Sequence, residues 1–96
     1  MPADADDAFY DRADAHINLS NEQMEGTALG KVSASMLYGT SRFNAWISAC
    51  GFESGEQMRD ARAETIRYFV EEYEKMLVEN LDDYIENFEK YMKLSH

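Results

Sequence analysis

The chain has 96 residues, 45% of them hydrophobic and 29% charged, which is the composition of one globular domain and not of a disordered chain. Nineteen acidic residues against nine basic ones give a formal net charge of −10, which excludes nucleic acids and anionic membrane surfaces as expected partners. No run of about 18 apolar residues is present to span a bilayer. The acidic start of the chain lacks a signal peptide's apolar segment, and the single cysteine cannot form an internal disulfide, so we expect a cytoplasmic protein.

The first predicted helix covers residues 4–25. Three aspartates crowd its start, where carboxylates can accept hydrogen bonds from free backbone N–H groups. The side chains that share one face follow helical spacing: Phe9, Ala13, Ile17, Ser20 and Met24. Gly26 is suited to ending this helix because glycine readily adopts the left-handed conformation.

The second predicted helix covers residues 28–50. Seven residues repeat at steps of three and four along it: Leu29, Val32, Met36, Gly39, Phe43, Trp46 and Cys50. Many of the remaining side chains are small, which would let neighbouring helices approach closely. We therefore expect this to be the central and most buried helix, with Gly39 at a close approach and Cys50 as a small core residue.

The third predicted helix covers residues 55–94. It begins after Ser54, which forms a capping box with Gln57. Its apolar stripe consists of Ile66, Val70, Tyr73, Leu77, Leu81, Tyr84, Phe88 and Met92. The stripe keeps its phase throughout, which favours one continuous helix. The alternative is a break near Asn80, which with Asp83 imitates a second capping box.

These elements predict an all-α fold in a single domain over residues 1–96. The expected arrangement is an antiparallel helical hairpin plus a long C-terminal helix, forming a three-helix bundle. A break near Asn80 would make it a bundle of four helices.

No motif for catalysis, phosphate binding or metal binding is found in the sequence, so we expect no enzyme, no cofactor and no metal site. Four polar residues could line a small-ligand site between the first two helices: His16, Gln23, Arg42 and Asn44. The simpler interpretation makes His16 a hydrogen-bonded residue at the edge of the core. In the same interpretation, Arg42 forms an ion pair with a carboxylate on another helix.

The third predicted helix would be nearly twice as long as either of the others, so its distal half would lack cover within one chain. The apolar side chains left there are Leu77, Leu81, Tyr84, Ile85, Phe88 and Met92. An exposed strip of this length predicts a homo-oligomer, with a dimer as the default. The acidic run over residues 71–89 could also attract a basic protein partner.

Two segments, Phe9–Gln23 (FYDRADAHINLSNEQ) and Ser41–Trp46 (SRFNAW), resemble a small bacterial family, domain of unknown function 3144. The resemblance covers nearly the whole chain and implies a bacterial, cytoplasmic, single-domain protein. That family has no assigned activity and so implies no catalytic residues. We therefore expect a non-enzymatic oligomeric interaction or structural protein. The alternative is a small-ligand-binding or regulatory module that uses the His16 and Arg42 region.

Overall fold

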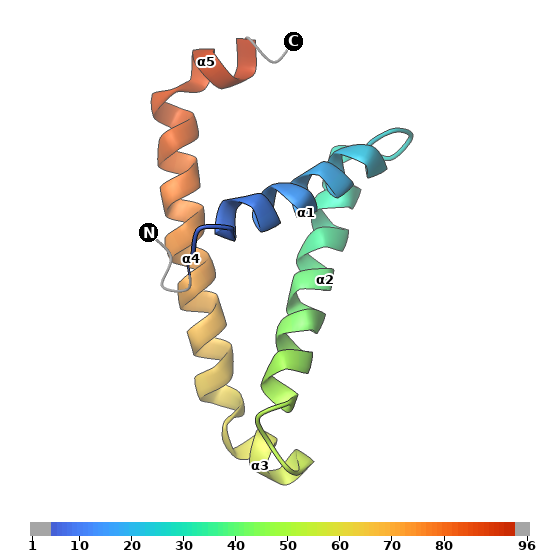
Figure 1. The fold of residues 1–96 in the computed structure, drawn as a ribbon, viewed down its shortest axis with the longest axis vertical. Helices are drawn as coiled ribbons and strands as arrows, with labels where there is room; N and C mark the ends of the chain where they lie inside the picture. The colour runs from blue at the N-terminus through green and yellow to red at the C-terminus, as the bar shows by residue number, and fades with distance from the viewer. Residues whose placement is uncertain (1–4, 94–96) are drawn as a thin grey trace. The chain divides into compact units, whose positions relative to one another are not determined.

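The computed structural model describes residues 5–93, and within that range the chain forms helices and no strand, which confirms the all-α prediction (Figure 1). The helices are α1 (Phe9–Gln23), α2 (Leu29–Ala49), α3 (Gly55–Asp60), α4 (Arg62–Glu86) and α5 (Phe88–Lys93). The chain divides into two compact units, Met1–Arg59 and Asp60–His96. The first holds α1, α2 and α3, and the second holds α4 and α5. That all 96 residues act as one domain stays a prediction.

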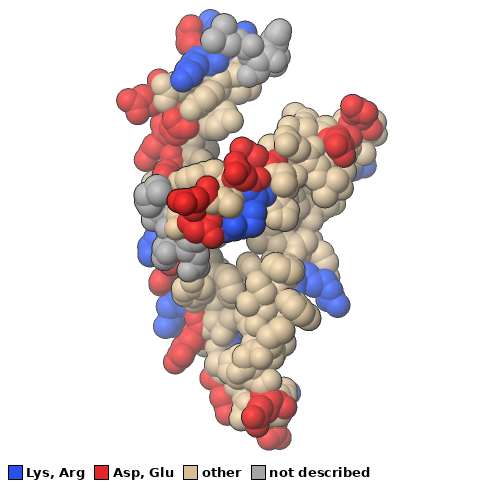
Figure 2. Space-filling view, in the orientation of Figure 1, with Lys and Arg blue, Asp and Glu red and all other residues tan. Residues whose placement is uncertain are grey.

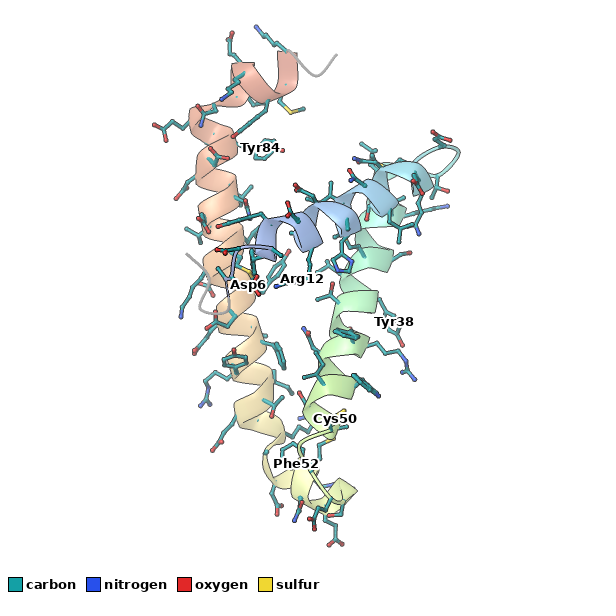
Figure 3. The ribbon with its side chains drawn as sticks, in the orientation of Figure 1. Asp6, Arg12, Tyr38, Cys50, Phe52 and Tyr84 are labelled. Carbon is teal, nitrogen blue, oxygen red and sulfur yellow. The ribbon has the colours of Figure 1, made fainter. Side chains whose placement is uncertain are left out.

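The first helix begins later than predicted, because residues 5–8 lie outside it and α1 starts at Phe9. Asp6 organises the turn that leads into α1. One carboxylate oxygen of Asp6 accepts hydrogen bonds from the backbone N–H of Ala8 at 3.2 Å and from the guanidinium of Arg12 at 3.0 Å (Figure 3). The hydrogen bond and charge of Arg12 lower the pKa of Asp6 below its usual value. Asp4, the outermost of the predicted capping residues, lies outside the described residues.

The helices α1 and α2 contact each other within the first unit and are joined by a short turn (Figure 1). Gly26 has φ +95°, a left-handed conformation that side chains strongly disfavour, so the predicted role of this glycine is confirmed. The hydroxyl of Ser20 on α1 lies 3.4 Å from the sulfur of Met36 on α2. One small polar side chain thus meets a flexible apolar one where the two helices touch.

The predicted capping box is present at the start of α3. The backbone N–H of Gln57 donates to the Ser54 hydroxyl at 3.2 Å, and the Gln57 side-chain oxygen accepts from the backbone N–H of Glu53 at 2.8 Å. The reciprocal bond therefore comes from the residue before Ser54 and not from Ser54 itself. In this arrangement the side-chain oxygens of Ser54 and Gln57 each accept one backbone N–H.

Replacing Ser54 with alanine should lower the free energy of unfolding by about 1 kcal/mol, because the N–H of Gln57 loses its acceptor. Chemical denaturation followed by circular dichroism measures this. Ser41→Ala is the matched control, since the Ser41 hydroxyl bonds to the Tyr38 carbonyl inside a helix and caps nothing. Equal denaturation midpoints for the two variants would contradict a capping role for Ser54.

The prediction of one helix over residues 55–94 is wrong at two places. The chain leaves the helical conformation at Ala61 (φ −96°, ψ 3°) and at Asn87 (φ −113°, ψ 28°), which separates α3, α4 and α5. The alternative break near Asn80 is absent. Asn80 lies inside α4, where its side-chain amide donates to the Met76 carbonyl at 2.9 Å.

Side-chain hydrogen bonds hold the bend between α4 and α5. The Asn87 amide donates to the Asp83 carbonyl at 3.1 Å and to the Asp83 carboxylate at 2.9 Å. The Tyr91 hydroxyl donates to the other carboxylate oxygen of Asp83 at 2.9 Å. The Tyr91 ring also lies against the Tyr84 ring, with centroids 4.6 Å apart. These contacts compete with straight helix continuation and explain why the apolar stripe alone did not predict the bend.

Burial is slight throughout the described residues. Val32 on α2 is the one buried hydrophobic residue there, at 5% exposure. The expectation that α2 is a buried central helix is therefore wrong for this structure. Cys50 is exposed, and a Cβ built on Gly39 would meet no other atom within 4 Å. The seam along α2 is thus a largely open apolar face and not a core.

Candidate functional site

The four residues predicted to line a ligand site come from two contacting helices. His16 and Gln23 lie on α1, and Arg42 and Asn44 lie on α2. His16, Gln23 and Arg42 are exposed, whereas Asn44 is half-buried. Within residues 5–93 no hydrogen bond or ion pair joins any two of them. The ligand-binding alternative therefore stays a prediction.

Among residues 5–93, the partners that the simpler interpretation assigned to His16 and Arg42 are not found either. Ser20 lies one turn from His16 but contacts Met36. The ion pairs within residues 5–93 join Arg12 to Asp6, Lys75 to Glu72 and Lys93 to Glu89, and none involves Arg42. Arg42 thus keeps an exposed guanidinium on α2.

An exposed apolar face runs along α4. Its members, called here the α4 stripe, are Ile66, Val70, Tyr73, Leu77, Leu81 and Tyr84, each between 41% and 58% exposed. The structure therefore presents the apolar spacing seen in the sequence as one uncovered line on a single helix. Tyr84 projects from the helix near its C-terminal end (Figure 3).

The bend at Asn87 divides the residues predicted to form an oligomer interface. Leu77, Leu81, Tyr84 and Ile85 remain on α4, and Phe88 and Met92 belong to α5. All six are exposed, with Ile85 the most exposed at 74%. A partner helix lying straight along the α4 stripe would follow Leu77, Leu81 and Tyr84. Phe88 and Met92 on α5 lie beyond the bend.

A second exposed apolar line, called here the α2 row, runs along α2. Its members are Leu29, Met36, Phe43 and Ile47, exposed by 68%, 41%, 60% and 48%. Beside them the rings of Phe43 and Trp46 stack with centroids 5.9 Å apart, and Trp46 is 62% exposed. Large aromatic side chains of this kind are enriched in protein interfaces. Sequence reasoning assigned Leu29, Met36, Phe43 and Trp46 to the core, because spacing alone does not show whether a face is covered, and it did not single out Ile47.

The two helices differ sharply in charge. Between Leu29 and Ala49, α2 has two basic residues, Lys31 and Arg42, and no acidic one. Between Arg62 and Glu86, α4 has eight acidic residues and three basic ones. The surface over α2 is accordingly largely uncharged in the space-filling view, whereas acidic side chains are frequent along α4 (Figure 2). One apolar face thus lies on a basic helix and the other on an acidic helix.

The cluster at the end of α4 changes the acidity of a tyrosine. The hydrogen bond from the Tyr91 hydroxyl to the Asp83 carboxylate raises the pKa of Tyr91 above its usual value, because ionisation would place two negative charges side by side. A tyrosine pKa that is higher in the folded chain stabilises the fold fully below about pH 10. That contribution is lost as the pH rises through the raised value.

Asp83→Asn should lower the pKa of Tyr91 towards the usual tyrosine value, because the neighbouring negative charge is removed. The ring chemical shifts of Tyr91, followed by NMR between neutral pH and the alkaline limit of the fold, measure this. Asp82→Asn, at the adjacent exposed position, removes the same charge without the hydrogen bond and should leave that pKa nearly unchanged. Identical titration curves in both variants would contradict the role of Asp83.

Two further features are absent from the part of the chain that the structure describes. No three residues among His, Cys, Asp and Glu come together there as a metal site would require. None of the helices there combines the length and apolar character needed to cross a bilayer.

Comparison with known proteins identifies the family. The model of the family described as "Protein of unknown function (DUF3144)" matches residues 9–85, and the chain belongs to this family. Its structure is similar to the NMR structure of the protein NB7890A from Shewanella sp., with a TM-score of 0.77 and 38% sequence identity, over 96% of this chain and 98% of that one. No curated protein matches the sequence. These findings confirm the predicted family and the helical fold.

Proposed function

We propose that this DUF3144 chain is a non-enzymatic, cytoplasmic interaction or structural protein that works as a homo-oligomer, with a dimer as the default. The observation that supports the proposal is the α4 stripe, a line of six large side chains that are all between 41% and 58% exposed. Single soluble chains seldom leave so long an apolar line uncovered, and such a line commonly marks an interface.

The interior of the chain supports the same proposal. Val32 is the one buried hydrophobic residue within residues 5–93, although hydrophobic residues make up 45% of the sequence. Hydrophobic burial is the main driving force of folding, at roughly 25 cal/mol per Å² of apolar area. Association would supply burial that the described chain lacks. A structural role in an assembly needs no catalytic group, which agrees with the lack of a catalytic motif in the sequence.

Light scattering on the full chain tests this proposal. We expect a mass at least twice the chain mass of 11.1 kDa at micromolar concentration. Because each chain carries a net charge of −10, copies repel one another, and salt screens that repulsion over about 8–10 Å. Dimerisation should therefore tighten as salt is added. A chain that stays monomeric at all concentrations and salt levels would contradict the proposal.

A further inference from the structure

We propose that the bend at Asn87 is one state of a conformational switch, and that α4 and α5 also form one straight helix over residues 62–93. The contacts of the Asp83 carboxylate hold the bent form, in which α5 turns away from the axis of α4 (Figure 1). In the straight form the α4 stripe continues into α5. This inference goes beyond the proposed function, because both forms belong to a single chain. Three observations on the described residues support it.

The first observation is that two contacts of this region depend on the bend. The Tyr91 hydroxyl reaches the Asp83 carboxylate at 2.9 Å across eight residues, and the ring centroids of Tyr84 and Tyr91 lie 4.6 Å apart across seven. Side chains that meet on a straight helix are three or four residues apart. Seven and eight residues of straight helix correspond to about 10.5 and 12 Å of rise. Straightening therefore breaks both contacts, and Tyr91 takes part in each.

The second observation is that Asn80 and Asn87 make the same local bond but differ in outcome. Each side-chain amide donates to the carbonyl four residues earlier, at 2.9 Å for Asn80 and 3.1 Å for Asn87. Asn80 stays helical, so this bond does not by itself end a helix. Of the two, only Asn87 follows a carboxylate four residues earlier, and that carboxylate of Asp83 accepts from both Asn87 and Tyr91. The Asp83 carboxylate therefore distinguishes the bent site from the helical one.

The third observation is that the backbone permits a straight helix. Between Arg62 and Lys93 only Asn87 lies outside a helix, and no proline or glycine follows Gly55. Within residues 5–93, the backbone N–H groups of Phe88 and Lys90 donate to no carbonyl four residues earlier. A straight helix would give both groups such an acceptor. Straightening thus exchanges two side-chain hydrogen bonds to Asp83 for two backbone hydrogen bonds, so the two forms are closely balanced in free energy.

The straight form lengthens the α4 stripe. Phe88 and Met92 follow Tyr84 at steps of four residues, which is a spacing that the stripe itself uses. In the bent form both side chains lie beyond the bend and are exposed, by 56% and 38%. Tyr91, once released from Asp83, falls seven residues after Tyr84 on the same face. The switch therefore controls the length of the apolar line that residues 62–93 present.

NMR on the full chain tests the switch. The Cα chemical shift of Asn87 reports the balance between the two forms, and hydrogen exchange reports the protection of the Phe88 and Lys90 amides. Asp83→Ala should raise the ratio of straight to bent form at least about tenfold, because two hydrogen bonds of the bent form are lost. We expect the Asn87 shift to move towards the helical value and both amides to gain protection.

Two further variants separate the carboxylate contacts from charge and helix propensity. Asp82→Ala is the matched control, because it makes the same substitution at the adjacent exposed position and breaks neither contact of Asp83. It should leave the Asn87 shift at the value of the parent chain. Tyr91→Phe removes only the hydroxyl and keeps the ring. It should move the Asn87 shift in the same direction as Asp83→Ala, by a smaller amount.

The outcomes decide between a switch and a fixed bend. Equal Asn87 shifts in the Asp83→Ala and Asp82→Ala chains would overturn the inference. Non-helical shifts throughout residues 88–92 of the Asp83→Ala chain would also overturn it, because the contacts would then keep α5 folded and not bent. A helical shift at Asn87 together with protected amides in the Asp83→Ala chain supports it. Light scattering on the same samples reports self-association separately, so the outcome for the proposed function stays distinguishable.

Discussion

Replacing Leu81 with glutamate is expected to separate the assembled protein into single chains, with the dissociation constant raised at least about 100-fold. Burying a leucine side chain contributes roughly 1.5–3 kcal/mol, and a two-fold dimer contains the contact twice. Each 1.4 kcal/mol of lost binding free energy corresponds to about a tenfold change in the dissociation constant. The buried glutamate adds a desolvation cost in the same direction. Light scattering or analytical ultracentrifugation over a range of concentrations measures the change.

Val78→Glu is the control for this substitution. Val78 and Leu81 lie on the same helix and are both 53% exposed, but only Leu81 belongs to the α4 stripe. Both variants add one negative charge, so both raise the repulsion between copies equally. Leucine and glutamate have similar helix propensity, so circular dichroism should show an intact helix in the Leu81→Glu chain. Equal dissociation of the two variants would mean that charge, and not the stripe, controls assembly.

Local sequence signals predicted two features near helix ends, each at a residue with a strong conformational preference. Gly26 adopts the left-handed conformation expected of it, and Ser54 receives the expected hydrogen bond from Gln57. The unchanged phase of the apolar stripe correctly predicted that α4 continues through Asn80. Each of these features depends on residues only three or four positions apart, so sequence spacing contains the information.

The two interruptions of the predicted C-terminal helix could not be found in this way. Alanine is the best helix former, so Ala61 gives no sequence signal for the non-helical conformation it adopts. Asn87 ends α4 with a side-chain amide that bonds to both the carbonyl and the carboxylate of Asp83, and Tyr91 adds a third bond to this residue. An asparagine inside a helical pattern can either continue the helix, as Asn80 does, or end it, as Asn87 does.

Periodicity identified the apolar faces but not what covers them. The seam on α2 has the spacing of a buried helix, yet Phe43 and Trp46 are about 60% exposed. Spacing reports which side chains share a face, whereas burial depends on a partner surface that local sequence does not specify. The same limit applies to the candidate ligand residues. The sequence places His16 and Arg42 on neighbouring helices, but spacing alone does not show whether their side chains converge on one site.

Gly39→Leu is expected to leave the chain as stable as before or slightly more stable. A leucine there meets open space within the chain, and replacing a glycine inside a helix contributes up to about 1 kcal/mol of helix stability. A closely packed helix at this position would instead lose about 1–3 kcal/mol through overpacking. This variant therefore tests whether the face of α2 at Gly39 is open. Gly30→Leu is the matched control, because Gly30 also lies in α2 with nothing within 4 Å but lies on the opposite side of the helix. Thermal melting followed by circular dichroism compares the two variants with the parent chain. If Gly39→Leu melts well below both Gly30→Leu and the parent, the face of α2 at Gly39 is packed and not open.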